Sequence, residues 1–287
     1  PTFAPMDFLK HAGQAGLRWF TRHVPIRGRH RLADTVGRWV SDPVTVRSIN
    51  GIKVELDRDI QYHRMMLFDL YEENVLNYLR RRLKPGMVVF DPGCNIGYFA
   101  AQVLGMVQPG GQVWSFEPSP TCLTRIRRHN PSGSVPGWSL QAAALTNRSG
   151  KLTFFDTPRV VTHGYAVLEE ACKPNDRVPV EVAVTSVDDF CAAQGISHID
   201  FLKLDIEDSE LPALQGAARM LAERAIDTIL VETEVRPDRV KLNDRIFKLL
   251  RDSGFRPHHA RRDGTLVQVE PERMPPHKED IIWELQR

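Results

Sequence analysis

Cysteine is scarce in this sequence, uninterrupted apolar runs are missing, and the net charge is close to zero. The four cysteines show neither C-x-x-C pairing nor histidines at zinc-finger spacing, so we expect reduced, mostly buried thiols and a cytoplasmic protein. Glycine and proline repeatedly break the uncharged stretch from Pro92 to Phe116, which excludes a transmembrane span. No apolar run with a cleavage site marks the N-terminus, and a net charge of +2 is too small for a protein built around nucleic acid.

The composition is that of an ordinary globular protein. The 287 residues are 42% hydrophobic and 26% charged, enough to bury a core without disulfides. This length suits one sizeable domain with an extension. We expect an extension over residues 1–60 and a main domain over residues 61–287.

The first forty residues are the most basic segment. Phe8, Ala12, Ala15 and Trp19 recur at helical spacing, which predicts an amphipathic helix. Such a helix could lie on an anionic membrane, mediate dimer contacts or pack on the core with its basic face in water, and the last of these is the commoner arrangement.

The next segment predicts a β-hairpin and then a helix. The sequence alternates from Val44 to Leu56 around Asn50-Gly51, a dipeptide that favours a tight type I′ turn. Apolar residues recur on one face from Glu72 to Leu83, which predicts a helix that ends before Pro85-Gly86.

Short apolar runs then alternate with helical stretches, the pattern of βαβ units around a parallel sheet. The predicted strands are Val88–Phe90, Gln112–Phe116, Ser139–Ala144, Phe201–Leu204, Thr228–Glu232, Thr265–Val269 and Ile281–Leu285. The predicted helices are Ile96–Val107, Pro120–Arg128, Val187–Gln194, Leu211–Leu221 and Asp244–Ser253.

A glycine-containing loop joins the first of these strands to its helix. Asp91 ends the strand, and Gly93 and Gly97 let backbone N–H groups and the helix N-terminus approach a ligand. Roughly twenty residues further on, a second strand ends in Glu117, where an acid can bind both hydroxyls of a ribose. The pattern therefore indicates a nucleotide-type cofactor, although Asp91 could serve only as a helix cap.

The spacing argues against a dinucleotide. A dinucleotide fingerprint starting at Gly93 needs glycine where Asn95 and Tyr98 stand. S-adenosyl-L-methionine has no phosphate and carries a sulfonium cation, so an acid such as Asp91 suits it. A nicotinamide-dependent oxidoreductase is the alternative that this spacing disfavours.

Four motifs in order resemble those of the FkbM-type methyltransferases: VVFDPGCNIGYF, VWSFEPSP, LQAAALTNRSGKLTFF and VTSVDDFCAAQGISHIDFLKLDIEDSELPALQGA. The similarity covers most of residues 60–235. It implies an α/β, Rossmann-like class I fold. That fold has a mostly parallel seven-stranded sheet, an antiparallel C-terminal strand and helices on both faces. Three residues depart from the pattern of the family that the sequence resembles: Pro92, Cys94 and Asp208, the last of which stands where that pattern has glycine. These departures leave open a binding protein that keeps the fold without the transfer activity.

The resemblance also implies a site. The methionine part of the cofactor would lie by Asp91 and the loop after it, the ribose at Glu117, and the adenine at Ala142-Ala143. The expected cofactor residues are Asp91, Gly93, Cys94, Asn95, Gly97, Tyr98, Glu117, Pro118, Ala142, Ala143 and Asp205.

A hydroxyl acceptor must lose its proton when it attacks the methyl group, and a carboxylate or histidine within reach could take it. The candidates are Asp205, Glu207, His163 and Glu232. Clustered carboxylates could instead hold a divalent cation, and each candidate could also be a helix cap or a solvated charge. The basic run Arg256–Arg262 could bind an anionic acceptor, but such runs are more often solvated loops.

We expect direct transfer of the methyl group to an oxygen nucleophile. The resemblance to the FkbM-type family implies that this oxygen is a hydroxyl on a sugar, a lipid-linked glycan or a polyketide-type molecule. Nitrogen acceptors stay open.

Overall fold

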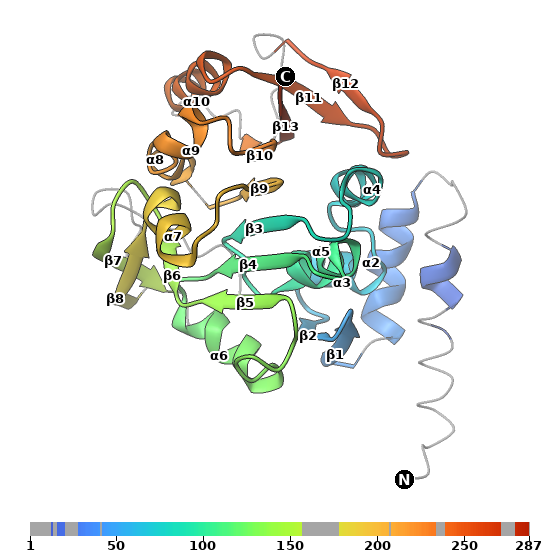
Figure 1. The fold of residues 1–287 in the computed structure, drawn as a ribbon. Helices are drawn as coiled ribbons and strands as arrows, with labels where there is room; N and C mark the ends of the chain where they lie inside the picture. Colours follow the sequence, from blue (N-terminus) through green and yellow to red (C-terminus); the bar gives the residue numbers. More distant parts are fainter. Residues whose placement is uncertain are drawn as a thin grey trace. The chain divides into compact units, whose positions relative to one another are not determined.

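The computed structural model describes residue 13 and residues 16–20, 28–40, 42–156, 178–206, 208–233, 239–270 and 279–286 (Figure 1). Its contacts divide the chain into two units, Pro1–Glu73 and Asn74–Arg287. None of the helices in the described ranges is long and apolar enough to cross a membrane.

The smaller unit contains the predicted hairpin. Strands β1 (Val44–Ile49) and β2 (Ile52–Asp57) pair antiparallel, with Ile49 opposite Ile52. The two residues between them, Asn50 and Gly51, have φ angles of 48° and 89°. These positive values are those of the type I′ turn that the sequence predicted.

Two helices of the same unit, α2 (Arg29–Val40) and α3 (Gln61–Leu67), are joined by an ion pair in which the buried Arg64 of α3 contacts Asp34 of α2 at 2.6 Å. Arg29 of α2 pairs with Glu73, which lies beyond α3. The sequence analysis did not predict α2. The helix that it predicted around Phe8 lies mostly outside the described residues; Trp19, which is described, is 61% exposed.

A mixed sheet of eight strands forms the centre of the larger unit, in the order β12-β11-β13-β10-β9-β3-β4-β5 (Figure 1). Its five strands from β10 to β5 are parallel, whereas the C-terminal strand β13 runs antiparallel to both of its neighbours. The bounds are β3 (Val88–Pro92), β4 (Gln112–Phe116), β5 (Trp138–Gln141), β9 (Phe201–Leu204), β10 (Thr228–Thr233), β11 (Phe255–Ala260), β12 (Leu266–Gln268) and β13 (Glu279–Leu285). The expected mostly parallel α/β sheet is confirmed, and β12 extends its edge.

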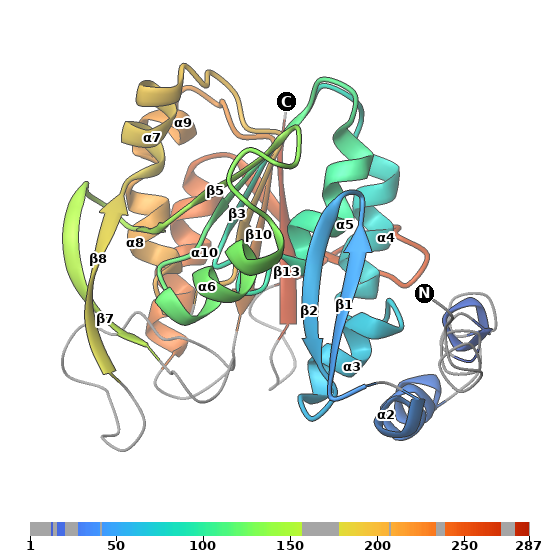
Figure 2. The same ribbon diagram turned by 90° about the horizontal axis from the view of Figure 1, so that it is seen from below.

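Helices cover both faces of this sheet, with α4 and α5 on one side and α8, α9 and α10 on the other (Figure 2). The helices of this unit are α4 (Glu73–Arg82), α5 (Tyr98–Val107), α6 (Pro120–His129), α7 (Val187–Gln194), α8 (Glu210–Gln215), α9 (Ala218–Ala222) and α10 (Val240–Asp252). Helix α4 begins one residue before the unit. The core between the layers is apolar and includes Phe90, Phe116, Ile229 and Trp283, all fully buried.

Two predicted elements are wrong in their continuity. The strand predicted over Ser139–Ala144 is two strands, because the chain bends at Ala142 and continues as β6 (Ala143–Leu145) in a separate sheet. The helix predicted over Leu211–Leu221 is interrupted at Gly216, where a Cβ would lie 2.1 Å from the backbone oxygen of Thr146.

Three further strands were not predicted, namely β7 (Gly150–Asp156), β8 (Val178–Thr185) and β11. In the separate three-stranded sheet, β8 pairs with β6 on one side and with β7 on the other. The basic run Arg256–Arg262, which we interpreted as a loop or an anion site, mostly forms β11 in the main sheet, with Phe255 and Pro257 buried.

Candidate functional site

Five predicted site residues lie in one row along the carboxyl edge of the parallel strands. In order across the edge they are Ala142, Glu117, Gly93, Asp205 and Glu232. The strand pairs that set this register are Phe116↔Gln141, Pro92↔Phe116, Phe90↔Leu202 and Leu204↔Val231. Since neighbouring strands are about 4.8 Å apart, Glu117 and Asp205 are separated by roughly 10 Å across the edge. This is the edge at which open α/β sheets bind their ligands.

The loop after β3 is held in an unusual backbone conformation. Gly93, Asn95 and Gly97 have φ angles of 73°, 52° and 81°. The N–H groups of Gly93 and Cys94 both donate to the carbonyl oxygen of Phe116, at 2.8 and 3.1 Å, which fixes the loop to β4. Gly97 is the N-cap of α5, so no side chain caps the N-terminus of this helix at that position.

Glu117 is buried beside this loop and accepts two backbone hydrogen bonds. Its two carboxylate oxygens each accept one N–H at 2.8 Å, from Asn95 and from Ser119. Burial raises the pKa of Glu117 to about 7; the two N–H groups oppose that rise, while Asp156 and Asp91 add to it. A ligand that donates hydrogen bonds to this carboxylate would therefore favour its charged form and lower its pKa.

Asp156, at the end of β7, organises the other side of Glu117. It accepts the hydroxyl hydrogens of Ser119 at 2.6 Å and of Thr121 at 2.7 Å, and it is 4% exposed. The Ser119 oxygen in turn caps α6 by accepting the N–H of Cys122 at 3.1 Å. A hydrogen-bond network thus runs from the three-stranded sheet to Glu117, and sequence reasoning missed its anchor.

The remaining predicted cofactor residues border the same region. Cys94 and Tyr98 are buried, Pro118 and Ala143 are half-buried, and Ala142 is exposed. Burial raises the pKa of the Cys94 thiol well above its usual value, with Asp91 and Glu117 adding to the effect.

Among the catalytic candidates, the structure brings Asp205 and Glu232 to neighbouring strand ends. The Asp205 carboxylate lies 3.0 Å from the ammonium of Lys203, a lysine that is 4% exposed. Sequence reasoning missed Lys203, because a single lysine within an apolar strand gives no sign of its partner. Glu207 and His163 lie outside the described residues, so their placement stays a prediction.

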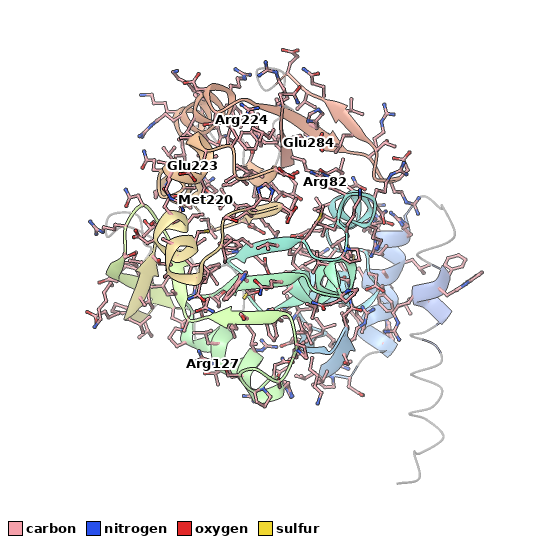
Figure 3. All side chains as sticks on the ribbon, viewed as in Figure 1. Arg82, Arg127, Met220, Glu223, Arg224 and Glu284 are labelled. Carbon is pink, nitrogen blue, oxygen red and sulfur yellow. The ribbon has the colours of Figure 1, made fainter. Side chains whose placement is uncertain are left out.

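One group in the described ranges has donor atoms close enough to hold a metal ion, namely His198, Asp200 and Asp227. These residues precede β9 and β10, so they lie at the amino edge of the sheet and do not include Asp205. Arg82, labelled with Glu284 in Figure 3, also reaches Asp227 at 3.3 Å and competes with a cation there.

The family of the chain follows from a comparison with protein-family models. Residues 91–257 match the methyltransferase FkbM domain, over more than half of the chain. The chain belongs to the FkbM methyltransferase domain family. The matched segment begins at Asp91 and includes the whole row at the carboxyl edge.

Curated members of this family are distant relatives. The 2-O-methyltransferase NoeI of Sinorhizobium fredii (strain NBRC 101917 / NGR234) is 26% identical, over 49% of this chain and 61% of NoeI. The 31-O-demethyl-FK506 methyltransferase FkbM of Streptomyces tacrolimicus is 29% identical, over 48% of this chain and 63% of that protein. The chain thus spans about six-tenths of the length of these two relatives.

Solved structures also resemble the chain. The methyltransferase FkbM from Methylobacillus flagellatus KT has a TM-score of 0.42 at 18% identity, covering 89% of this chain and 59% of that one. The transferase PH0793 from Pyrococcus horikoshii has a TM-score of 0.44 at 14% identity, covering 90% of this chain and 82% of that one.

Proposed function

We propose that the protein is an S-adenosyl-L-methionine-dependent methyltransferase that methylates a hydroxyl oxygen. The observation that carries this proposal is the row of Glu117, Gly93 and Asp205 at the carboxyl edge of a parallel sheet. Membership of the FkbM family supports the same reaction.

The chemistry of the row suits this cofactor. Glu117 and Asp91 are both buried acids, at 5% and 0% exposure, and a nucleotide phosphate beside them would be repelled. An uncharged ribose diol can donate to the Glu117 carboxylate, and a sulfonium cation is stabilised by nearby negative charge. These properties favour S-adenosyl-L-methionine over a nicotinamide dinucleotide.

In this assignment each part of the row has its own task. Glu117 accepts hydrogen bonds from the ribose, and the backbone of residues 93–97 lies beside the amino-acid end. When bound, S-adenosyl-L-methionine supplies an electrophilic methyl group. The protein then contributes mainly alignment of the acceptor oxygen, which can be equivalent to effective molarities on the order of 10⁵ M or more.

Asp205 is the proposed proton acceptor among the described candidates. It is level with Gly93, its carboxylate is held by Lys203, and it is half-buried at the strand end. Glu232, one strand further along the edge, is the second candidate. His163 and Glu207 stay in the proposal through the sequence alone.

For the acceptor we propose a hydroxyl on a sugar, a glycan or a polyketide-type molecule. The names of the two relatives support oxygen as the acceptor atom, since one is a 2-O-methyltransferase and the other is a 31-O-demethyl-FK506 methyltransferase. The two names differ in the molecule methylated, so they support the class of atom more strongly than the class of substrate.

Calorimetric titration with S-adenosylhomocysteine, with NADH in a parallel cell, tests the cofactor. We expect micromolar binding of S-adenosylhomocysteine alone, whereas binding of NADH alone would refute the proposal. Transfer of a radiolabelled methyl group to a panel of hydroxylated sugars and macrolides then tests the reaction. Binding without transfer to any member, including amine controls, would favour the non-catalytic binding protein.

A further inference from the structure

The turn after β9 contains an aspartate in a backbone conformation that favours glycine. Asp208 has a φ angle of 73°, in the left-handed region. The family pattern has glycine at this position, and glycine adopts that conformation without a steric penalty. For Asp208 the same conformation is strained, so the surrounding structure must stabilise the turn.

Arg239, at the start of α10, supplies that stabilisation. Its guanidinium forms an ion pair with Asp208 and lies 3.6 Å from the carboxylate of Glu210. The side chains of Arg239 and Glu210 are only 6% and 1% exposed. Burial raises the pKa of Glu210 to about 7 despite the opposing effect of Arg239.

Glu210 extends this contact to the backbone of the turn. Its other carboxylate oxygen accepts the N–H of Ile206 at 3.3 Å. Arg239 therefore holds the turn at two points, directly through Asp208 and indirectly through Glu210. Because α10 follows β10, the contact ties the connection after β10 to the connection after β9.

The same turn is packed tightly against the loop after β3. A Cβ placed on Gly93 would lie 2.4 Å from the backbone oxygen of Asp205 and 3.0 Å from the Ile206 side chain. Asp205 and Ile206 therefore limit the positions that the loop of residues 93–97 can take. Displacement of the turn would be transmitted to that loop.

We propose that Arg239 is a positioning residue that holds the turn after β9 against the cofactor loop by binding Asp208 and Glu210. In this assignment Asp208 replaces the family glycine and is kept in place by its charge. The inference rests on the proposed function for its identification of the cofactor loop. The contact of Arg239 with Asp208 and Glu210, here called the clamp, can be measured without a cofactor.

Two measurements on each variant test the proposal: the Kd for S-adenosylhomocysteine, and the hydrogen-exchange rate of the Ile206 amide. Loss of a buried ion pair is costly, so Arg239→Met is expected to raise both by about tenfold or more. Arg239→Lys retains the charge and should recover most of each loss. Lys248→Met is the matched control, because Lys248 lies on the same helix, is exposed and pairs with the exposed Asp252.

Substitutions of Asp208 separate the conformation of the turn from its charge. Asp208→Gly is expected to keep the Kd within about twofold, because glycine takes the positive φ angle freely. Asp208→Ala loses the ion pair and keeps the strain, so it should weaken binding more than Asp208→Gly does.

Each outcome decides a different point. Unchanged exchange at Ile206 in folded Arg239→Met, or the same change in Lys248→Met, would overturn the clamp. A wild-type protein that fails to bind S-adenosylhomocysteine would contradict the proposed function, while its exchange rates would still test Arg239. If Asp208→Gly and Asp208→Ala weakened S-adenosylhomocysteine binding equally, this would refute the inference that the charge of Asp208 compensates for the missing glycine.

Discussion

Replacement of Glu117 by alanine should separate cofactor binding from the rest of the fold. The change removes the carboxylate proposed to accept both ribose hydroxyls. Hydrogen bonds to a charged group contribute about 1.5–3 kcal/mol, so the Kd for S-adenosylhomocysteine should rise roughly 10- to 150-fold. The N–H groups of Asn95 and Ser119 lose their acceptor as well, and this acts in the same direction.

The pH dependence of binding gives the same prediction an independent readout. The pKa of Glu117 is raised to about 7, and ribose hydroxyls that donate to the carboxylate favour its charged form. Cofactor binding should therefore release a proton near neutral pH. Affinity should fall as the pH drops below about 7, by at most tenfold per pH unit for a single group.

Calorimetry in two buffers with different ionisation enthalpies would measure the released proton. Glu117→Ala should lose the part of the pH dependence that belongs to Glu117. Glu223→Ala is a control on an exposed carboxylate that pairs with Arg219, and it should leave the Kd unchanged. Unaltered affinity in a folded Glu117→Ala protein, or a Kd that is constant from pH 5.5 to 8, would refute the ribose assignment.

Four further predictions concern the supporting structure. Gly93→Ala adds a Cβ 2.4 Å from a backbone oxygen at a φ angle of 73°, so it should lower the melting temperature and abolish S-adenosylhomocysteine binding; normal binding would contradict the packing. Asp156→Asn leaves the hydroxyls of Ser119 and Thr121 with a weaker acceptor, and the Kd should rise at least about threefold in a calorimetric titration. The raised pKa of Glu210 contributes stability that is present below about pH 4.5 and is lost as the pH rises through 7. The free energy of unfolding should fall by up to about 3 kcal/mol over this range. Urea denaturation at pH 5 and pH 8 should therefore show a smaller difference in Glu210→Gln than in the wild-type protein. Deletion of residues 1–27, which spares α2, should reduce any dimer to a monomer in light scattering if the basic segment mediates dimer contacts; an unchanged mass would count against that role.

The elements predicted best are those whose boundaries are written in local sequence. The strands Gln112–Phe116 and Phe201–Leu204 were predicted with the bounds that the structure has, because each is a short apolar run between turn residues. Helix Val187–Gln194 was also predicted in full. Ser186 caps its N-terminus by accepting the N–H of Asp189, and Gly195 ends it in a left-handed conformation.

Elements whose buried face shows no clear apolar periodicity in the sequence were missed. The stripe of α2 that faces its own unit consists of Arg29, Ala33 and Gly37, which gives no hydrophobic periodicity. Strand β11 buries Phe255 and Pro257, but the proline and the surrounding charges conceal that alternation. Only the tertiary partners of these residues explain their burial.

The residues of the site also divide into those that the sequence predicted and those that it did not. Strand ends can be predicted from sequence, so Asp91, Glu117 and Asp205 could be assigned to one edge before the structure was known. The residues that support them were missed for two reasons. Asp156 and Arg239 come from distant segments, and nothing in their local sequence indicates a hydrogen bond or an ion pair across the fold. Lys203 lies only two residues before Asp205, but a single lysine within an apolar strand does not show that its partner is the nearby carboxylate.

The departures from the family pattern bear on whether the protein is a catalyst or only a binding protein. Pro92 occupies the last paired position of β3, opposite Phe116, so the strand reaches its full length despite the proline. Burial raises the pKa of the Cys94 thiol, which keeps it neutral and therefore a poor nucleophile towards a neighbouring sulfonium. Asp208 has a φ angle of 73°, a backbone conformation that glycine adopts freely. None of these three residues therefore gives a physical reason for lost activity, which agrees with the methyl transfer proposed above.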